Sequence, residues 1–380
     1  MAKIQLIATA TFGLEAVVAR EVSDLGYSDV KVENARVLFE ADESAISRCN
    51  LWLRSADRVL IRIGEFGAQS FDELFERTKA LPWEEWLPVD ANFPVTGKSV
   101  KSKLFSVSDC QAIVKKAIVE RLKKVYHKSW FDETGPQYKI EVALLKDNVT
   151  LTIDTTGPGL HKRGYRKLSA QAPLKETLAA AMINLSYWNH ERVLIDPFCG
   201  SGTIPIEAAL IGLNIAPGIN RNFVSETWPQ IPTAIWQQTR AEANDLIKRD
   251  RILKIIGTDI DEAVLSLARY HRKLANLNEQ IHLQRLPLAE LRSSYKYGCV
   301  ICNPPYGERI GEVKEIEQLY RQMGRVFQQL DTWSIYVLTA HQNFEKIYGK
   351  KADRRRKLYN GRIECQFYQF YGPKPPNKNN

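Results

Sequence analysis

Several features that would place a protein in a membrane or outside the cell are missing from this sequence. No apolar run reaches the roughly 18 residues that a membrane-spanning helix requires. The first residues, MAKIQLIATATFGLEAVVAR, lack the long apolar stretch and the cleavage site of a signal peptide. The six cysteines are scattered over 380 residues, so reduced thiols are expected in place of a disulfide framework. These absences predict a cytoplasmic protein.

Common metal and nucleotide motifs are missing or incomplete as well. Cys299 and Cys302 form a CxxC pair inside an apolar run, and no second pair accompanies it, which favours buried strand cysteines over a metal or redox site. The glycine turn at 200–202 lacks the third glycine of a dinucleotide fingerprint, because Pro205 occupies that position. No Walker lysine follows the turn. We therefore expect no metal site. The sequence carries neither a complete dinucleotide fingerprint nor a Walker motif.

The charge of the chain is biased toward basic residues. Lysine and arginine number 53 against 44 acidic residues, and the net charge of +9 favours polyanionic partners. Basic residues cluster along a predicted helix, around Gly164, and at 354–357. One such cluster is typical of a solvated face, but three in a basic chain favour nucleic acid, although the cluster around Gly164 is equally well explained as a charged linker. The RNA-binding candidates are Lys115, Lys116, His161, Lys162, Arg163 and Arg166.

Two blocks of alternating strands and helices precede residue 160. The first is a small α+β unit ending near Phe66, with strands predicted at 4–9, 33–40 and 57–65 and helices at 13–25 and 44–54. The second has helices predicted at 70–79 and 108–124, strand pieces at 91–96 and 101–104, and strands at 138–144 and 148–154. Lys146 and Asp147 join the last two strands. The turn residues TTGPG at 155–159 indicate a boundary.

The third block alternates strands with helices of ten or more residues. Its strands are predicted at 192–195, 254–258, 299–302 and 333–339. Its helices are predicted at 172–185, 204–213, 237–249, 261–276 and 316–329. This order predicts an α/β fold with a mostly parallel, doubly wound sheet and helices on both faces. The last residues, 373–380, are expected to be disordered.

Three motifs end strands of this predicted sheet. In VLIDPFCGSGT a strand ends at Asp196, Gly200 and Gly202 form a turn, and a helix begins. The glycines let a ligand approach the backbone and the helix N-terminus offers N–H groups, although such a turn alone is weak evidence. In GTDID, Asp259 ends the next strand, where an acid can accept hydrogen bonds from both ribose hydroxyls. Asp261 is predicted to cap the following helix.

The third motif, NPPY at 303–306, stops a buried strand abruptly. Proline removes a donor from the ladder of a sheet, and a pair of prolines ends any regular element. Because open α/β sheets bind ligands at the carboxyl ends of their strands, Asn303 and Tyr306 are expected to face the same ligand as Asp259. Singly, the asparagine is typical of a turn and the tyrosine of a core. The order of the three motifs is what favours a binding site.

These motifs resemble a known family. DPFCGSGT, GTDID and NPPYGERI in this order resemble the S-adenosylmethionine-dependent methyltransferases that modify exocyclic amino groups. NPPY alone is shared with DNA adenine, DNA cytosine and protein glutamine methyltransferases. The entry segment GLHKRGYRKLSAQAPLKETLAAAMI and the two N-terminal blocks narrow the resemblance to RNA guanine-N2 methyltransferases with a THUMP RNA-binding domain. Up to its tail the chain is similar to the N-terminal half of the large bacterial 23S ribosomal RNA guanine-N2 methyltransferases.

The resemblance implies a domain order, a cofactor and a substrate. The domains would be a ferredoxin-like module at 1–66, a THUMP domain at 67–157 and a Rossmann-like class I methyltransferase domain at 158–372. The cofactor would be S-adenosyl-L-methionine, and the substrate RNA, either 23S ribosomal RNA or an assembly intermediate. The implied cofactor-binding residues are Asp196, Phe198, Gly200, Gly202, Thr203, Asp259, Ile260 and Asn303. The implied catalytic residues are Asn303, Pro304 and Tyr306.

The chemistry of an aromatic amine gives a role to the turn at Pro304 and Pro305, which we call the diproline corner. The nitrogen lone pair of such an amine is delocalised into the ring, so the amine is a poor nucleophile. The side-chain oxygen of Asn303 and the carbonyl of Pro304 would each accept one N–H bond and direct the lone pair toward the methyl sulfonium. Tyr306 would stack on the target base, which must be extruded or single-stranded. Neither a metal nor a dedicated base is required, since the methylated amine is a strong acid.

Some alternatives stay open. Related enzymes place an acid for the adenine amino group at the end of the third strand, but that position falls near Pro287, with Glu290 out of register. The adenine contact is therefore unassigned. A transfer RNA guanine-N2 methyltransferase fits the same architecture. A non-catalytic RNA-binding assembly factor is the alternative outside enzymes, although all the motif residues are present. A DNA adenine methyltransferase is disfavoured because the N-terminal blocks look like RNA modules.

Overall fold

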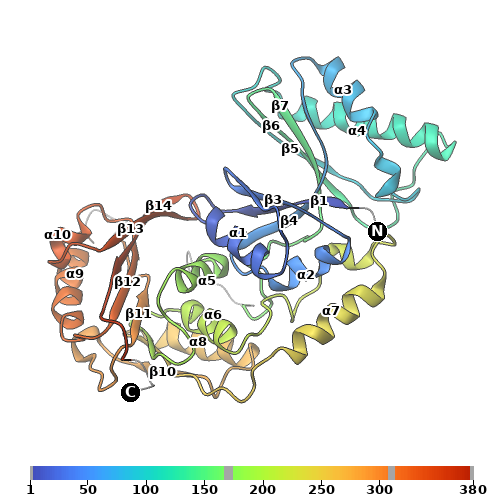
Figure 1. Cartoon of the computed structure of the whole chain (residues 1–380). Coiled ribbons are helices and arrows are strands. Elements are labelled where there is room, and N and C mark those ends of the chain that lie inside the picture. The colour runs from blue at the N-terminus through green and yellow to red at the C-terminus, as the bar shows by residue number, and fades with distance from the viewer. Residues whose placement is uncertain (1–2, 167–173, 307–312, 377–380) are drawn as a thin grey trace. The chain divides into compact units, whose positions relative to one another are not determined.

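A computed structural model describes residues 3–166, 174–306 and 313–376, and these form two compact units (Figure 1). The first unit comprises Met1–Thr9, Ala19–Leu160 and Asn222–Ala241. The second comprises Ala10–Val18, His161–Arg221 and Glu242–Asn380. Helices α1 (Glu15–Asp24) and α7 (Thr233–Asp245) contain residues of both units. Neither unit is therefore one continuous stretch of sequence.

The first unit is built on one seven-stranded sheet in the order β2-β3-β1-β4-β7-β6-β5. Its strands are β1 (Ile4–Ala10), β2 (Lys31–Glu33), β3 (Arg36–Ala41), β4 (Ala56–Gly67), β5 (Val95–Val100), β6 (Lys139–Leu145) and β7 (Asn148–Asp154). Its helices include α2 (Ser44–Trp52), α3 (Phe71–Lys79) and α4 (Val107–Tyr126). Figure 1 shows α3 and α4 packed together beside strands β5 to β7. Strand β5 lies at the edge of the sheet and pairs in parallel with β6.

Two hairpins in this sheet turn without glycine. The predicted turn between β6 and β7 is confirmed, and Lys146 and Asp147 adopt positive φ angles of 51° and 64°. The strand predicted at 33–40 is confirmed as β3 from residue 36 onward, but its first residues are wrong, because two short antiparallel strands, β2 and β3, turn at Asn34 and Ala35. Ala35 has a φ of 59°, a conformation that a side chain disfavours, so no glycine marks this turn in the sequence.

The second unit contains the predicted doubly wound sheet, in the order β10-β9-β8-β11-β12-β14-β13. Its strands are β8 (Leu194–Asp196), β9 (Ile255–Asp259), β10 (Ile281–Arg285), β11 (Cys299–Cys302), β12 (Ser334–Thr339), β13 (Arg354–Asn360) and β14 (Ile363–Phe370). The first five run parallel, and β14 is antiparallel to both of its neighbours. The chain moves outward in opposite directions from β8 and β11, so a topological switch point lies between these strands.

Three strands of this sheet were not predicted. β10 and β13 are its two edge strands, and they carry sequences rich in polar residues, IHLQR and RRRKLYN. An edge strand has open sides that tolerate charge, so the apolar alternation that marks an inner strand is weak there. The basic run at 354–357 belongs to β13, and β14 returns beside it.

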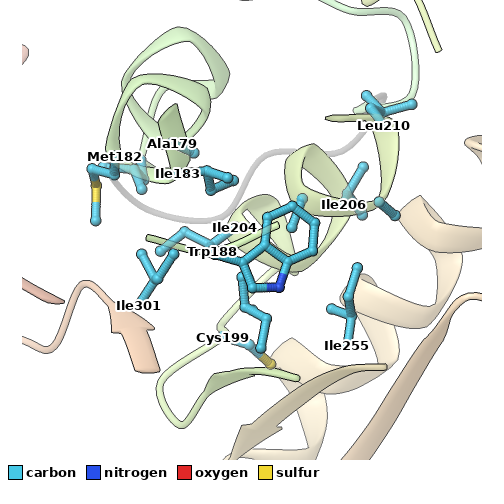
Figure 2. Close-up of a cluster of buried hydrophobic side chains, with 14 of the residues drawn as sticks. Ala179, Met182, Ile183, Trp188, Cys199, Ile204, Ile206, Leu210, Ile255 and Ile301 are labelled. Atoms are coloured by element: carbon cyan, nitrogen blue, oxygen red, sulfur yellow. The ribbon is translucent and has the colours of Figure 1, made fainter. Parts of the chain in front are cut away.

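Helices cover both faces of this sheet, as predicted. On one face α5 (Glu176–Asn184), α6 (Thr203–Gly212) and α8 (Glu262–Leu274) contribute to an apolar cluster, in which Trp188 lies among side chains of α5, α6 and the strands (Figure 2). On the other face α9 (Val313–Phe327) and α10 (Phe344–Tyr348) pack Tyr320, Phe327 and Phe344 against β11, β12 and β14. Burial of these clusters fixes the strand ends that carry the motifs.

The remaining general predictions concern membranes and cysteines. Within the described ranges, the structure has no helix whose length and apolarity would allow it to cross a membrane. Cys299 and Cys302 lie fully buried in β11, as their apolar surroundings predict. Burial raises the pKa of the Cys299 thiol to about 12, so it is an inert core residue.

Candidate active site

The three motifs lie at neighbouring strand ends. Strand β8 pairs in parallel with β9 on one side and with β11 on the other. Asp196, Asp259 and Cys302 are the last residues of these three strands, and Asn303 follows the third. Parallel strands end at the same edge of a sheet, and ligands of open α/β sheets bind at that edge beside a switch point such as the one between β8 and β11. The structure thus brings together the motifs that the sequence predicted to share a site.

The glycine turn after β8 needs its two glycines for different reasons. Gly200 has a φ of 50°, and a Cβ added there would meet no atom within 4 Å. Gly202 has a φ of 85°, and a Cβ there would lie 3.2 Å from the Cβ of Ala268. Gly202 therefore allows α6 and α8 to pack closely. Gly200 instead keeps an open side of the turn, which is where a ligand can approach the backbone.

Two carboxylates hold the backbone of this turn. Asp196 is 1% exposed, and its Oδ1 accepts a hydrogen bond from the N–H of Phe198 at 3.1 Å. Burial raises the pKa of Asp196 well above its ordinary range, and the nearby charge of Asp259 adds to that effect. Asp259 is half-buried, and its Oδ2 accepts a hydrogen bond from the N–H of Gly200 at 2.9 Å. These bonds fix the turn relative to the ends of β8 and β9.

The loop after β9 carries the predicted cap and an exposed apolar side chain. Asp261 accepts a hydrogen bond from the N–H of Ala263 at 2.8 Å, which confirms it as the N-cap of α8. Asp259 also accepts from the N–H of Asp261 at 3.1 Å. Ile260 between them is 64% exposed. Its side chain offers an apolar surface beside the strand end, and the predicted adenine position Pro287 follows β10, the neighbouring strand.

The diproline corner is held from two directions. The Tyr306 hydroxyl donates a hydrogen bond to the side-chain oxygen of Asn303. Pro304 is buried, and the carbonyl of Pro305 accepts a hydrogen bond from the hydroxyl of Tyr320 at 2.8 Å. A carbonyl-type oxygen has two lone pairs, so Asn303 can accept a second hydrogen bond while it keeps the first. The rest of the motif, Gly307 to Arg309, lies outside the described residues.

The ring of Tyr306 packs against the apolar core of its unit. Burial raises the pKa of its hydroxyl, and the neighbouring Cys365 adds to the effect. The predicted stacking of this ring on a target base stays a prediction. In the structure the hydroxyl orients Asn303, a role that spacing alone did not suggest.

Arg163 was predicted to bind RNA, and the structure corrects that prediction. Arg163 is 3% exposed, and its guanidinium lies 3.4 Å from the carboxylate of Glu207 on α6. The Tyr165 hydroxyl donates to the same carboxylate at 3.1 Å. A buried, paired guanidinium cannot reach an RNA phosphate without breaking this pair. Arg163 therefore anchors the linker to α6.

Arg166 points at the glycine turn. Its guanidinium donates to the Thr203 hydroxyl and to the carbonyl of Leu174 at 3.3 Å, and it pairs with Glu176 at 3.1 Å. Its Nε is buried and has no hydrogen-bond partner among the described residues. An orphaned donor beside the first residue of α6 is suited to an anion. Arg166 therefore lies beside the glycine turn, and its predicted contact with RNA stays a prediction.

Three family models match the chain in order. The RlmL ferredoxin-like domain matches residues 5–60, and the THUMP domain matches residues 68–154. The RMKL-like methyltransferase domain matches residues 163–369, which is more than half of the chain. The chain belongs to the RMKL-like methyltransferase family.

Relatives of this RMKL-like methyltransferase cover nearly all of its sequence. It is 51% identical to YpsC of Bacillus subtilis (strain 168), across 100% of this chain and 98% of YpsC. It is 34% identical to the ribosomal RNA large subunit methyltransferase K/L of Syntrophotalea carbinolica, across 97% of this chain and 54% of that protein. The chain therefore spans about half the length of the K/L relatives that it matches.

Solved structures share the whole architecture. A Listeria monocytogenes protein, described as a predicted N6-adenine-specific DNA methylase, is 56% identical with a TM-score of 0.94, across 98% of this chain and 97% of that one. SMU.472, solved in complex with SAH, is 46% identical with a TM-score of 0.94, across 99% of this chain and 100% of that one. SAH is what S-adenosylmethionine becomes after methyl transfer. The chain thus belongs to a family of S-adenosylmethionine-dependent methyltransferases, and the predicted class I fold is confirmed.

The other RNA-binding candidates of the RMKL-like methyltransferase differ in exposure. The ammonium of Lys115 pairs with Glu133 at 2.6 Å and lies 3.4 Å from the centre of the Phe93 ring, so its charge is already engaged. Lys116 and Lys162 are exposed, and His161 is half-buried. The two exposed lysines stay candidates for phosphate contacts, and Lys115 has a structural role that a helical pattern cannot reveal.

Tyr320 is a site residue that sequence reasoning missed. It lies on α9, fully buried, and besides Pro305 its hydroxyl contacts the Thr339 hydroxyl at 2.8 Å at the end of β12. Its ring meets His341 and Phe344 edge-on. The residue thus links the corner after β11 to the next strand. Its place in an amphipathic helix is typical of any core aromatic, so no sequence signal distinguished it.

Proposed function

We propose that this methyltransferase transfers a methyl group to the exocyclic N2 amine of a guanine in RNA, and that the RNA is 23S ribosomal RNA in the cytoplasm. The observation that supports this most is the corner at Asn303, which lies beside the glycine turn and Asp259 in a chain that also carries a THUMP domain. THUMP is an RNA-binding module in the family that the sequence resembles. The K/L relatives are named for the ribosomal large subunit.

The residues present fit the cofactor on three counts. Asp259 offers a carboxylate to the ribose, as its place at the end of β9 suggests. The open side of Gly200 admits a ligand against the backbone, and the orphaned Nε of Arg166 suits the carboxylate of an amino acid. The exposed Ile260 would pack on the adenine, for which no acid stands at Pro287. When bound, the cofactor supplies an electrophilic methyl on a sulfonium.

The corner would then prepare the amine. The side-chain oxygen of Asn303 and the carbonyl of Pro304 accept its two N–H bonds, and Tyr306 and Tyr320 hold the corner in place. Held in this way, the amine nitrogen would take the methyl that the bound cofactor supplies as its bond to sulfur breaks, and the methylated amine would give its proton to water. Holding nucleophile and methyl in line contributes up to ~7–11 kcal/mol in well-oriented reactions. Methyl transfer to the amine therefore depends more on rigidly held hydrogen-bond acceptors than on a strong base that removes the proton.

Two other substrates and one non-enzymatic role compete with this proposal. A guanine in transfer RNA would use the same site. The description of the Listeria relative points to adenine N6 in DNA, an amine that Asn-Pro-Pro-Tyr corners also accept. An assembly factor would bind RNA and transfer nothing. The THUMP match favours RNA over DNA, and the intact site favours an enzyme.

Calorimetry with S-adenosyl-L-methionine tests the cofactor residues. Asn303→Ala should bind the cofactor within about twofold of wild type, because Asn303 acts on the amine. Arg166→Gln should bind at least ~10-fold more weakly, since it loses a charge-assisted contact of roughly 1.5–3 kcal/mol. Unchanged affinity in Arg166→Gln would remove it from the cofactor site. Absence of binding by wild type would favour the assembly factor.

Mass mapping of modified nucleosides from a deletion strain tests the substrate. One N2-methylguanosine of 23S ribosomal RNA should disappear, return with the wild-type chain and stay absent with Asn303→Ala. Loss of the mark from transfer RNA would establish the transfer RNA alternative instead. Loss of N6-methyladenine from DNA would contradict the proposal in its substrate and its polymer.

A further inference from the structure

An aromatic side chain stands exposed at one end of the first unit's sheet. Phe105 is 82% exposed and lies in the connection between β5 and α4. Val100 ends β5 opposite Leu145, the last residue of β6, and both are half-exposed. We call this end of the sheet the β5–β6 tip, and it comprises Val100, Lys101, Lys103, Phe105, Leu145 and Lys146. Burying Phe105 in the fold would have been favourable, so its exposure calls for another explanation.

Hydrogen bonds hold the tip in one conformation. The N–H of Lys103 donates to the carboxylate of Asp147 at 2.7 Å, and the N–H of Asp147 donates to the hydroxyl of Ser102 at 3.0 Å. The N–H of Lys146 donates to the carbonyl of Val100 at 3.1 Å. These hydrogen bonds order the loop. The exposure of the Phe105 ring is therefore a feature of the folded loop and not a result of disorder.

The residue before Phe105 anchors this segment to the core of the unit. Leu104, directly before Phe105, is buried, and its carbonyl accepts a hydrogen bond from the Ser99 hydroxyl at 2.8 Å. The sequence thus alternates an inward leucine with an outward phenylalanine. The ring is presented to solvent on a fixed base.

The exposed charged side chains of the β5–β6 tip are all basic. Lys101, Lys103 and Lys146 are exposed at the tip. The one carboxylate within the turn, Asp147, accepts backbone and amide hydrogen bonds and so faces into the loop. Glu141, farther along β6, pairs with Lys98 at 2.8 Å. An exposed ring among lysines complements a polymer that offers both phosphates and open base faces.

We propose that the β5–β6 tip binds an unpaired stretch of the RNA, with Phe105 stacked on a base and Lys101 and Lys146 in contact with the flanking phosphates. This inference rests on the proposed function for the identity of the polymer. A single ring on a convex tip reaches a base face only where the base is unpaired, because paired bases are stacked inside a helix. A protein partner would gain little from the lysines, which favour a polyanion.

Fluorescence anisotropy with two labelled probes tests the tip in the full chain. The probes are a 12-nucleotide oligouridine and a 16-base-pair RNA duplex. Phe105→Ala should bind oligouridine about ten-fold more weakly, within the range of base–aromatic stacking, and the duplex within about twofold of wild type. Phe105→Tyr should keep the affinity. The double variant Lys101→Gln, Lys146→Gln should lower the slope of log affinity against log salt by about 1.4, since each lost phosphate contact contributes roughly 0.7 for single strands.

Trp130 provides a matched control, because it is 77% exposed in the same unit, between α4 and β6. Trp130→Ala should leave oligouridine affinity unchanged. An equal loss in Trp130→Ala, an equal loss on the duplex, or an unchanged affinity in Phe105→Ala overturns the proposal, and the last result would leave the tip to a protein partner. Failure of wild type to bind oligouridine overturns it as well. A chain that binds oligouridine through Phe105 and methylates no RNA supports the tip and removes only the proposed function.

Discussion

At the scale of single residues, the corner depends on the hydrogen bonds that two tyrosine hydroxyls make to it. Asn303 and Pro304 would accept the amine, but the Tyr306 hydroxyl orients the first and the Tyr320 hydroxyl holds the carbonyl of the next residue, Pro305. Acceptors that must localise a lone pair lose their effect when they drift by a fraction of an ångström. Tyr320 is therefore a positioning residue, and the hydroxyl of Tyr306 acts in the same way while its ring keeps the predicted stacking role.

Tyr320→Phe should slow methyl transfer about ten-fold with cofactor affinity within about twofold. The variant keeps the buried ring and loses only the hydroxyl, whose hydrogen bond contributes roughly 0.5–1.5 kcal/mol. Single-turnover rates and calorimetry measure the two effects separately. Tyr336→Phe is the matched control, because its buried hydroxyl accepts a hydrogen bond from the N–H of Tyr187, away from the corner. Equal slowing in both variants would assign Tyr320 a merely structural role.

Asp196→Asn should stabilise the protein more at pH 8 than at pH 5. Burial raises the folded-state pKa of Asp196 above its ordinary 3.8, so the folded state holds this proton more firmly than the unfolded state. Stability from this group is present at low pH and lost as pH rises from about 3.8 through the raised value. The variant can keep the oxygen that accepts from Phe198 while it removes the buried charge.

Thermal unfolding at both pH values measures this effect, and a gain of a few degrees at pH 8 is expected, at roughly 2–4 °C per kcal/mol for a unit of about 150–250 residues. Exposed Asp261, changed to asparagine in the same way, is the control and should gain no more at pH 8 than at pH 5. A gain for Asp196→Asn that is larger at pH 5 would contradict the sign of the argument.

At the scale of elements, the two glycines of the turn between β8 and α6 have different roles. Gly200 serves cofactor binding, and Gly202 serves the stability of the fold. Gly200→Ala should fold with a cost of about 1–2 kcal/mol for the left-handed backbone and lose at least ten-fold in cofactor affinity, because its methyl fills the open side. Gly202→Ala carries the same backbone cost and also crowds Ala268, so its loss of stability should be the larger. Urea unfolding and calorimetry measure the two quantities. Equal losses in both variants would contradict the assignment.

Elements and site were predictable wherever the chemistry is local. Proline and glycine restrict the backbone at their own positions, so NPPY and the turn at 200–202 indicated strand ends directly. Edge strands such as β10 and β13 tolerate charge, and their apolar alternation was too weak to predict a strand. Ion pairs between residues far apart in the chain also gave no signal in the sequence. Arg163 looked like a surface cation in sequence and is buried only because Glu207, on another element, meets it.

At the scale of the whole molecule, the compact units do not follow the order of the sequence. The predicted domain boundaries at 66 and 157 divide the chain into contiguous pieces, and these boundaries stay a proposal. The second unit includes Ala10–Val18, and the first includes Asn222–Ala241. Leu14 and Val17, from the first of these segments, are buried in the apolar cluster of the second unit together with Leu178 and Phe367. A cut between domains in sequence therefore does not separate the units.

A fragment of residues 158–372 should consequently be much less stable than the methyltransferase unit within the full chain. It lacks Leu14 and Val17, whose burial contributes roughly 1.5–3 kcal/mol each. It also keeps Trp228 and Trp236, which are buried in the first unit and would lose that cover. Urea unfolding followed by tryptophan fluorescence should show an earlier or non-cooperative transition. The full-length variant Leu14→Ala, Val17→Ala is the control, and it should reproduce part of the loss. Cooperative unfolding of the fragment at the midpoint of the full chain would show that residues 10–18 are dispensable and that the boundary at 158 is a true domain boundary.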